Sequence, residues 1–334
     1  MNIKRLTAFL IAALMALSLA ACSNGGNGAG TFDDAEDDPN EVKTGFAVIS
    51  EVRTDEADPG SIYKRSFVST VAAVIVDTDG RIVKAKVDVM EINADLENNG
   101  GVVENPKTRM EQGAEYNYLG ETALQSPWCD QLAAVEEFAQ GKTAKEFSDS
   151  FDYFSGITYD EELLTKCDID VGCEVKAIAQ AANDARALGA DDKNELKLAI
   201  TAKNFEPEEE GDFLAYRMEY ATVTMDKDGV ITSCIVDESE AKCGIIDGEY
   251  AEFPGIYDTK RQMGTQYGMK DVSPIGAEWD EQAKALEYFA AGKTPDELLA
   301  SVGSDNVTTD ADLITTCTIE INEMVDNIIK AADK

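Results

Sequence analysis

The sequence predicts an α+β protein of two tandem, similar domains, each a small antiparallel sheet with helices packed on one face. The first observation is an internal duplication. Shifting the chain against itself by 151 residues pairs Trp128 with Trp279, and the Gly-Lys-Thr at 141–143 with that at 292–294, without a gap. A period this long indicates two domains, not a solenoid of short units. The second observation is that each copy passes from β-rich runs to helical periodicity in the same order.

The N-terminus has the layout of a secretory signal. Two basic residues precede an apolar run over 6–19, which is too short for a comfortable membrane span, so we expect residues 1–21 to be a cleaved signal peptide. The run closes on Leu-Ala-Ala-Cys at 19–22, which resembles the lipobox of bacterial lipoproteins. This resemblance implies that Cys22 becomes the lipid-modified first residue and that the protein lies outside the cytoplasm, anchored to the bacterial cell membrane. An ordinary signal peptide with an incidental cysteine is the alternative.

Residues 22–41 are predicted to form a flexible tether, because glycine, asparagine and acidic residues dominate and almost no apolar side chain is present. Removing residues 1–21 takes away two of the 29 basic residues, so 27 basic residues face 65 acidic ones and the net charge is −38. This balance excludes nucleic acid as a partner. The expected partners are the lipid bilayer, through the anchor, and an unidentified protein or small molecule.

The residue types present limit the chemistry. No histidine occurs, which removes the usual general base near neutral pH and the commonest zinc ligand. Six cysteines follow Cys22 without a C-x-x-C spacing, so we expect no metal site. Their even number in an exported chain permits disulfides; the near pairs Cys167/Cys173 and Cys234/Cys243 are favoured, and free buried thiols are the alternative. We identify no catalytic residue and expect a protein that is not an enzyme.

The first domain, residues 42–187, is predicted to begin with a strand at 45–49 and a hairpin over 69–87. The hairpin turns at residues 77–80 (Asp-Thr-Asp-Gly), and the second copy repeats such a turn at 226–229. Paired aspartates are compatible with calcium. An EF-hand loop, however, also needs a third oxygen ligand before its glycine and a glutamate six residues after it, so we interpret both segments as turns.

Two helices with a sharp break between them follow each hairpin. Apolar residues recur at helical spacing from Trp128 and from Trp279, so both tryptophans are predicted to be core residues. A glycine then ends each helix, and Thr143 and Thr294 begin the next one with a glutamate three residues later, as in a capping box. The Gly-Lys-Thr is therefore interpreted as a helix break and not as a phosphate-binding loop.

Both copies end on an extended piece and a helix, over 158–182 and 308–332. Residues 188–195 are polar and are predicted to link the first domain to the second, residues 196–334. Because each domain has the size and the apolar content for its own core, we expect each to fold alone.

The hairpin over 221–242, followed by a threonine-bearing turn and a terminal helix, resembles the FMN-binding domain of bacterial surface lipoproteins, a family known for extracellular electron transfer. The signature of that family is Asp, two residues, Ser or Thr, then Gly-Ala-Thr, and its last threonine carries FMN through a phosphoester. Asp312, Thr315 and Thr318 match the outer positions, which implies a cofactor site there. Thr316 and Cys317 replace the glycine and the alanine.

Two interpretations follow from these substitutions. A β-branched threonine resists the tight backbone approach that glycine permits, and the first copy has Asp168 where the acceptor threonine stands. We therefore favour an extracytoplasmic, membrane-anchored, non-catalytic module that binds a ligand or partner and holds no cofactor. The alternative is an FMN-carrying flavoprotein in extracellular electron transfer.

Overall fold

The computed structural model describes residues 41–54, 62–116, 122–207, 210–251 and 257–334. The signal peptide, Cys22 and nearly all of the tether lie outside these residues. The first repeat contains β1 (Lys43–Arg53), β2 (Lys64–Val76), β3 (Ile82–Asp95), α1 (Leu96–Asn99), α2 (Arg109–Gln112), η1 (Gly113–Glu115), α3 (Trp128–Ala139), α4 (Ala144–Ser148), α5 (Glu161–Leu164) and α6 (Gly172–Asn183). The second contains β4 (Glu195–Asn204), β5 (Asp212–Met225), β6 (Ile231–Ile246), β7 (Glu249–Tyr250), α7 (Lys260–Met263), η2 (Gly264–Gln266), η3 (Met269–Asp271), α8 (Trp279–Ala290), α9 (Pro295–Leu299), η4 (Leu313–Thr315) and α10 (Asn322–Ala332).

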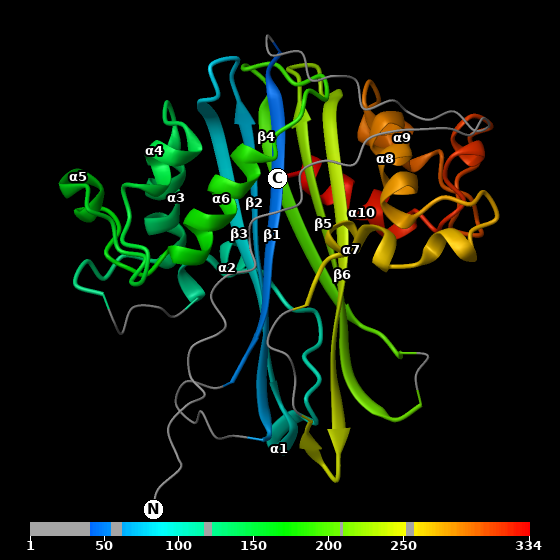
Figure 1. The fold of residues 1–334 in the computed structure, drawn as a ribbon, viewed down its shortest axis with the longest axis horizontal. Coiled ribbons are helices and arrows are strands. Elements are labelled where there is room, and N and C mark those ends of the chain that lie inside the picture. Colours follow the sequence, from blue (N-terminus) through cyan, green and yellow to red (C-terminus); the bar gives the residue numbers. More distant parts are fainter. Residues whose placement is uncertain (1–40, 55–61, 117–121, 208–209, 252–256) are drawn as a thin grey trace, which may run out of the picture. The chain divides into compact units, whose positions relative to one another are not determined.

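The predicted fold class is confirmed. Each repeat has one antiparallel sheet, in the order β1-β2-β3 and β4-β5-β6-β7, with its helices on one face (Figure 1). The predicted hairpins are present and longer than expected: β2 begins at Lys64 and not at residue 69. At the first turn, Asp77 Oδ1 accepts hydrogen bonds from the N–H groups of Asp79 and Arg81, which agrees with the interpretation of this segment as a turn.

The central strands are apolar on both faces, and the period of two divides their side chains between two cores. In β2, Val68, Ala72 and Val74 pack with α3 and α6 in the first repeat's own core. The alternate residues Phe67 and Val71 point the other way, into a core that also contains residues of the second sheet. The second repeat has an equivalent helix-facing core built on β5, β6, α8 and α10.

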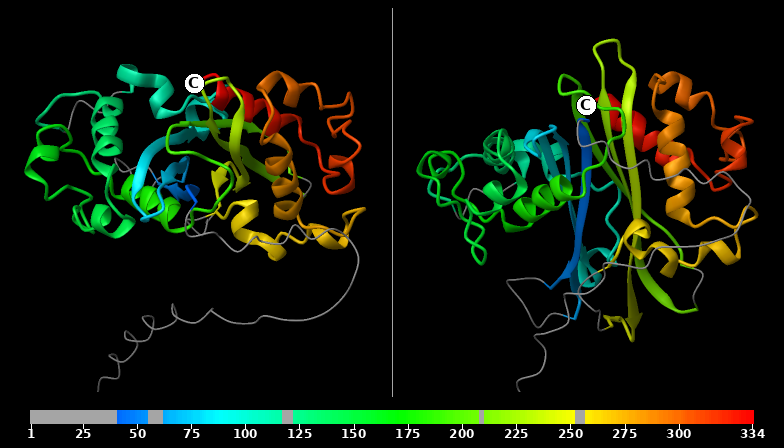
Figure 2. Two further views of the ribbon diagram at one scale, coloured as in Figure 1. Left: turned by 90° about the horizontal axis from the view of Figure 1, so that it is seen from above. Right: turned by 45° about the horizontal axis from the view of Figure 1, so that its top comes forward.

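The two sheets therefore pack on each other through a third, shared core. Its members include Val48 and Met90 from the first repeat and Ile200, Met218 and Tyr220 from the second. Figures 1 and 2 show the resulting layers: helices of the first repeat, its sheet, the second sheet, and helices of the second repeat. Each repeat has its own core, but one face of each sheet is covered only by the other repeat.

The predicted cysteine pairs are not formed, because all six described cysteines are free. Cys234 and Cys243 both lie on β6, nine residues apart, which places their Cα atoms about 30 Å apart and their side chains on opposite faces. Cys167 lies in the helix-facing core, whereas Cys173 is half-buried near Glu51. The structure thus agrees with the alternative prediction, free thiols.

The Gly-Lys-Thr segments are helix breaks, as predicted. Thr143 and Thr294 form complete capping boxes at the starts of α4 and α9. The break also pairs with the sheet: Gly141 N–H donates to the Ile82 carbonyl at 2.8 Å, and Ile82 N–H donates to the Lys142 carbonyl at 2.8 Å. These bonds satisfy the main chain where the helix ends and hold it to the hairpin.

Candidate functional site

The predicted cofactor residues lie around η4, just before α10. Asp312 and Thr315 are exposed, and the Thr315 hydroxyl donates to the Asp312 carbonyl at 2.7 Å. Thr318 is half-buried, and both its N–H and its hydroxyl donate to Oε1 of Gln282, at 2.9 and 3.1 Å. The contacts of Thr318 therefore go to α8, whereas those of Asp312 and Thr315 stay within the 3₁₀ turn.

The first repeat has the same main-chain hydrogen bond to a glutamine, but no hydroxyl at the equivalent position. Asp168 N–H donates to Oε1 of Gln131 at 3.0 Å, and one Asp168 carboxylate oxygen accepts from the N–H groups of Ala123 and Leu124. Gln131 and Gln282 are fully buried. Sequence reasoning missed these glutamines, although the signal was present: each stands three residues after its tryptophan, at the same repeat position.

The tryptophans are core residues, as predicted, with exposed fractions of 1% for Trp128 and 3% for Trp279. Each ring also faces a cation of the chain itself: the Arg109 guanidinium lies 5.4 Å from the Trp128 centroid, and the Lys260 ammonium lies 5.5 Å from the Trp279 centroid. These cation–π contacts occupy the positions that a cationic ligand would take on either ring.

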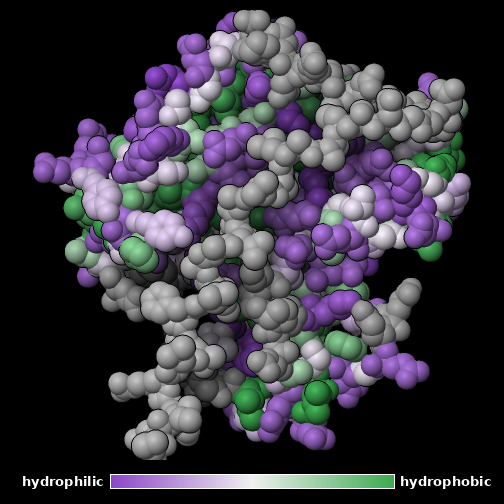
Figure 3. All heavy atoms as spheres, in the orientation of Figure 1, coloured by the Kyte–Doolittle hydropathy of each residue, from purple (hydrophilic) through white to green (hydrophobic). Residues whose placement is uncertain are grey.

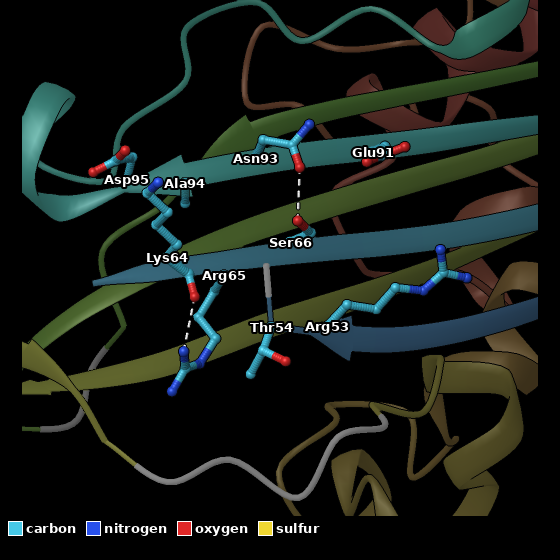
Figure 4. A pocket seen from close by; sticks show the side chains of 9 residues that line it. All are labelled: Arg53, Thr54, Lys64, Arg65, Ser66, Glu91, Asn93, Ala94 and Asp95. Carbon is cyan, nitrogen blue, oxygen red and sulfur yellow. Dashed lines mark hydrogen bonds between the residues drawn. The ribbon is translucent and has the colours of Figure 1, made fainter. Parts of the chain in front are cut away.

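A pocket of about 380 Å³ lies at the end of the first sheet, beyond these helices (Figure 4). It is lined by Arg53, Thr54, Lys64, Arg65, Ser66, Glu91, Asn93, Ala94 and Asp95. Strand register explains the set, because Ser66 of β2 pairs with Asn93 of β3, and Lys64 pairs with Asp95. The Ser66 hydroxyl donates to Asn93 Oδ1 at 2.6 Å, and Lys64 extends toward Asp95 in Figure 4.

The two acidic residues of this pocket are engaged within the chain. Burial alone would raise the pKa of Glu91, but the Arg109 guanidinium, 3.0 Å away at Nε, and the hydroxyl of Tyr116 lower that pKa overall. Asp95 accepts from the Asn98 side-chain amide at 2.7 Å and, as the N-cap of α1, from the N–H groups of Glu97 and Asn98; together these bonds lower its pKa. Glu91 is thus paired with a cation outside the pocket, whereas Asp95 also interacts with Lys64 inside it.

Basic residues make up three of the nine that line the pocket, a larger share than the 29 among 334 in the whole chain. Arg53 forms an ion pair with Glu51 at the pocket edge. The Arg65 guanidinium donates to the Lys64 carbonyl at 2.7 Å and lies over the ring of Tyr250. With Lys64, they give the pocket a surplus of cationic donors that suits an anion.

Two other kinds of feature, a metal site and a membrane-spanning helix, are absent from the described residues. Within them, no group of three or more cysteine, aspartate or glutamate side chains is placed to hold a metal ion. No described helix is long and apolar enough to cross a membrane. Comparisons of the chain with family models, curated proteins and solved structures give no match.

Proposed function

We propose that this chain is an extracytoplasmic, lipid-anchored binding protein without catalytic activity, and that the pocket at the end of its first sheet takes up a small anion. One observation supports the ligand class. In a chain with 65 acidic and 29 basic residues, three of the nine residues lining this pocket are basic. Two are acidic, Glu91 and Asp95, so the lining carries one more positive than negative charge and offers N–H and ammonium donors to an anion.

The pocket belongs to the first repeat alone. The 149-residue offset of the hairpins aligns Lys64 with Phe213, Arg65 with Leu214 and Ser66 with Ala215. The second copy therefore offers no donor at these three positions. A ligand role for the first copy explains why the two copies differ here while their cores remain alike.

Calorimetric titration of the purified chain with inorganic phosphate at low salt tests the anion site. We expect saturable binding that is at least tenfold weaker in Lys64→Gln, because the ammonium donates directly to the anion. Lys227→Gln is the matched control, since it removes the same charge from an exposed turn lysine. Equal losses in both variants would mean general charge attraction and would reject a site.

The anchor is tested independently. Cys22 lies outside the described residues, so the proposal rests on the lipobox-like Leu-Ala-Ala-Cys after the apolar run. Cys22→Ala is expected to release the protein into the medium or to leave it unprocessed, because the acylated residue is gone. Fractionation of cells followed by intact mass measurement reads out both effects; full membrane retention of the variant would contradict the anchor.

The flavoprotein is the second candidate, and the position of Thr318 favours it. This threonine is half-buried and lies four residues before the start of α10, so a transferase could reach its hydroxyl after one hydrogen bond to Gln282 is released. Co-expression with a flavin transferase, followed by intact mass and visible absorbance, distinguishes the candidates. One FMN per chain that disappears in Thr318→Ala would establish the electron carrier, and an unmodified chain would reject it.

A further inference from the structure

The two repeats meet at two junctions that the duplication makes equivalent. At one, the end of α10 meets α2 and β3 of the first repeat. Lys330 Nζ lies 2.6 Å from Glu111 Oε1, and Lys334 Nζ lies 3.8 Å from Asp88 Oδ2. These ion pairs join the second repeat to the first.

At the other junction, the end of α6 meets α7 and β6. The repeat offsets place Gln180 and Asp184 where the first junction has Lys330 and Lys334. The main chain is equivalent: Asp237 Oδ1 accepts from Arg261 N–H at 3.1 Å, as Asp88 accepts from Met110 N–H at 3.1 Å. The lysines are therefore missing from a junction whose backbone is otherwise preserved.

A pocket of about 340 Å³ lies at this second junction. Its lining comprises Phe46, Ala47, Val48, Gln180, Asp184, Arg186, Ile235, Asp237, Arg261, Gln262, Asp280 and Lys284. Figure 3 shows hydrophilic side chains gathered between the two repeats on the face that carries α6 and β6 toward the viewer. The volume is at the lower end of the range for small-molecule sites.

Three charged residues of this lining are specific to this junction. Arg261, Asp280 and Lys284 of the second repeat replace Met110, Cys129 and Ala133 of the first. Three positions that are uncharged at the lysine-paired junction are therefore ionised here. Packing alone does not require these charges, because uncharged residues occupy the same positions on the equivalent helices of the first repeat.

Four of the ionised side chains form no direct bond to another described residue, although Arg186 and Lys284 act to lower the pKa of Glu287 and Asp280 acts to raise that of Arg261. Asp184, Arg186, Asp280 and Lys284 make no side-chain hydrogen bond or ion pair within the described parts of the chain. Arg261 differs, because its guanidinium bonds to Glu287 and to the Val236 carbonyl at 3.1 Å. Two acids and two bases around one cavity thus remain without a hydrogen-bond partner among the described residues.

We propose that this inter-repeat pocket binds a small zwitterion that carries an ammonium and a carboxylate group, such as an amino acid or a short peptide. Asp184 and Asp280 would receive the ammonium, and Arg186 and Lys284 would receive the carboxylate, as charge-assisted hydrogen bonds. This site is separate from the anion pocket of the first repeat and does not depend on it.

Titration of the purified full chain with 6-aminohexanoate tests the class, with hexylamine and hexanoate as probes that each carry one of the two charges. We expect the zwitterion to bind at least tenfold more tightly than either control, because only it satisfies both signs. Equal binding of hexylamine would reduce the effect to the acidity of the chain and would overturn the proposal, as would no binding of the zwitterion.

Two variants introduce, at this pocket, the residues found at the equivalent positions of the other junction, where Lys330 and Lys334 form ion pairs. Asp184→Lys introduces the residue found at Lys334, and Lys284→Ala introduces the residue found at Ala133; each is expected to weaken 6-aminohexanoate binding at least tenfold. Asp184 is exposed at the end of α6, so its variant should keep the wild-type circular dichroism spectrum. Lys334→Ala, at the other junction, is the control that should leave the affinity unchanged. Unchanged affinity in both pocket variants would reject the assigned site.

Discussion

At the residue scale, buried carboxylates hold the helices to the sheets. Glu136 on α3 accepts from Val87 N–H at 2.9 Å, and its equivalent Glu287 on α8 accepts from Val236 N–H at 2.8 Å. Burial raises the pKa of both, although Lys86 and Arg261 beside them act in the opposite direction. The same carboxylate thus satisfies the same strand N–H in each copy, which gives a structural reason for an acid inside each core.

Asp237 gives a prediction about pH. Burial raises its pKa from 3.8 to about 6, so the folded chain binds this proton more tightly than the unfolded chain does. Its contribution to stability is therefore fully present below about pH 4 and is lost as the pH rises through about 6, a change of about 3 kcal/mol for a two-unit shift. Asp237→Asn should remove that part of the slope, because an amide oxygen still accepts the two backbone N–H groups. Urea unfolding between pH 4 and 7 measures it.

The matched control for this prediction is Asp228→Asn, in the exposed turn of the second hairpin. It should leave the pH dependence of the free energy of unfolding unchanged. If Asp237→Asn unfolds with the wild-type slope, another buried acid is responsible and the assignment is wrong.

Trp279 should behave as a core residue. It is 3% exposed and lies beneath Lys260, so Trp279→Ala is expected to lower the free energy of unfolding by about 3–5 kcal/mol. Val272→Ala, at an 80% exposed position, should change it by no more than about 0.5 kcal/mol. Denaturant titration measures both. A small loss of stability in Trp279→Ala together with lost ligand binding would instead identify Trp279 as a recognition residue.

At the element scale, the position of α6 against β1 depends on a glycine. A Cβ on Gly45 would lie 1.9 Å from the Ala181 carbonyl oxygen, a distance that no real Cβ contact shows. The helix therefore approaches the strand at a distance that only glycine permits. This contact is also next to the inter-repeat pocket, because Phe46 and Gln180 both line it.

Gly45→Ala should consequently force α6 away from the sheet. We expect a loss of about 3 kcal/mol or more in the free energy of unfolding, at the upper end of overpacking effects. Gly244→Ala in β6 is the matched strand control, since its Cβ would meet Ala251 at an ordinary 3.6 Å. The control should change stability by no more than about 1 kcal/mol. Similar values for the two variants, measured by thermal or urea unfolding, would contradict the close approach.

At the scale of the whole molecule, the shared core packs the two repeats against each other. Besides apolar residues, it contains a hydroxyl network in which Ser69 Oγ lies 2.8 Å from both the Tyr220 and the Tyr257 hydroxyls. Tyr220 in turn lies 2.6 Å from Ser239 Oγ. Groups that are this deeply buried and mutually bonded fix one arrangement of the two sheets.

From this shared core we predict, unlike the expectation from the sequence, that neither domain folds alone. Residues 42–187 or 196–334 by themselves would expose the apolar inner face of a sheet, so each isolated half should aggregate or self-associate. Co-expressed halves should instead elute as a 1:1 complex in size-exclusion chromatography with light scattering. A monomeric half that unfolds cooperatively, with most of the stability of the whole chain, would contradict this prediction.

The sequence by itself determined the duplication and the acidic balance, which need no knowledge of the fold. It also determined the hairpin turns and the capping boxes at Thr143 and Thr294, because a turn or a helix cap is decided within a few residues. Only the tertiary structure decided the partners. The sequence predicted helices on one face of each sheet, but not that the sheet of the other repeat covers the other face. The sequence did not predict the two pockets either. The inter-repeat pocket is lined by Asp184 and Lys284 among others, and the anion pocket by Arg53 and Asp95. No local pattern encodes which distant side chains a fold brings together.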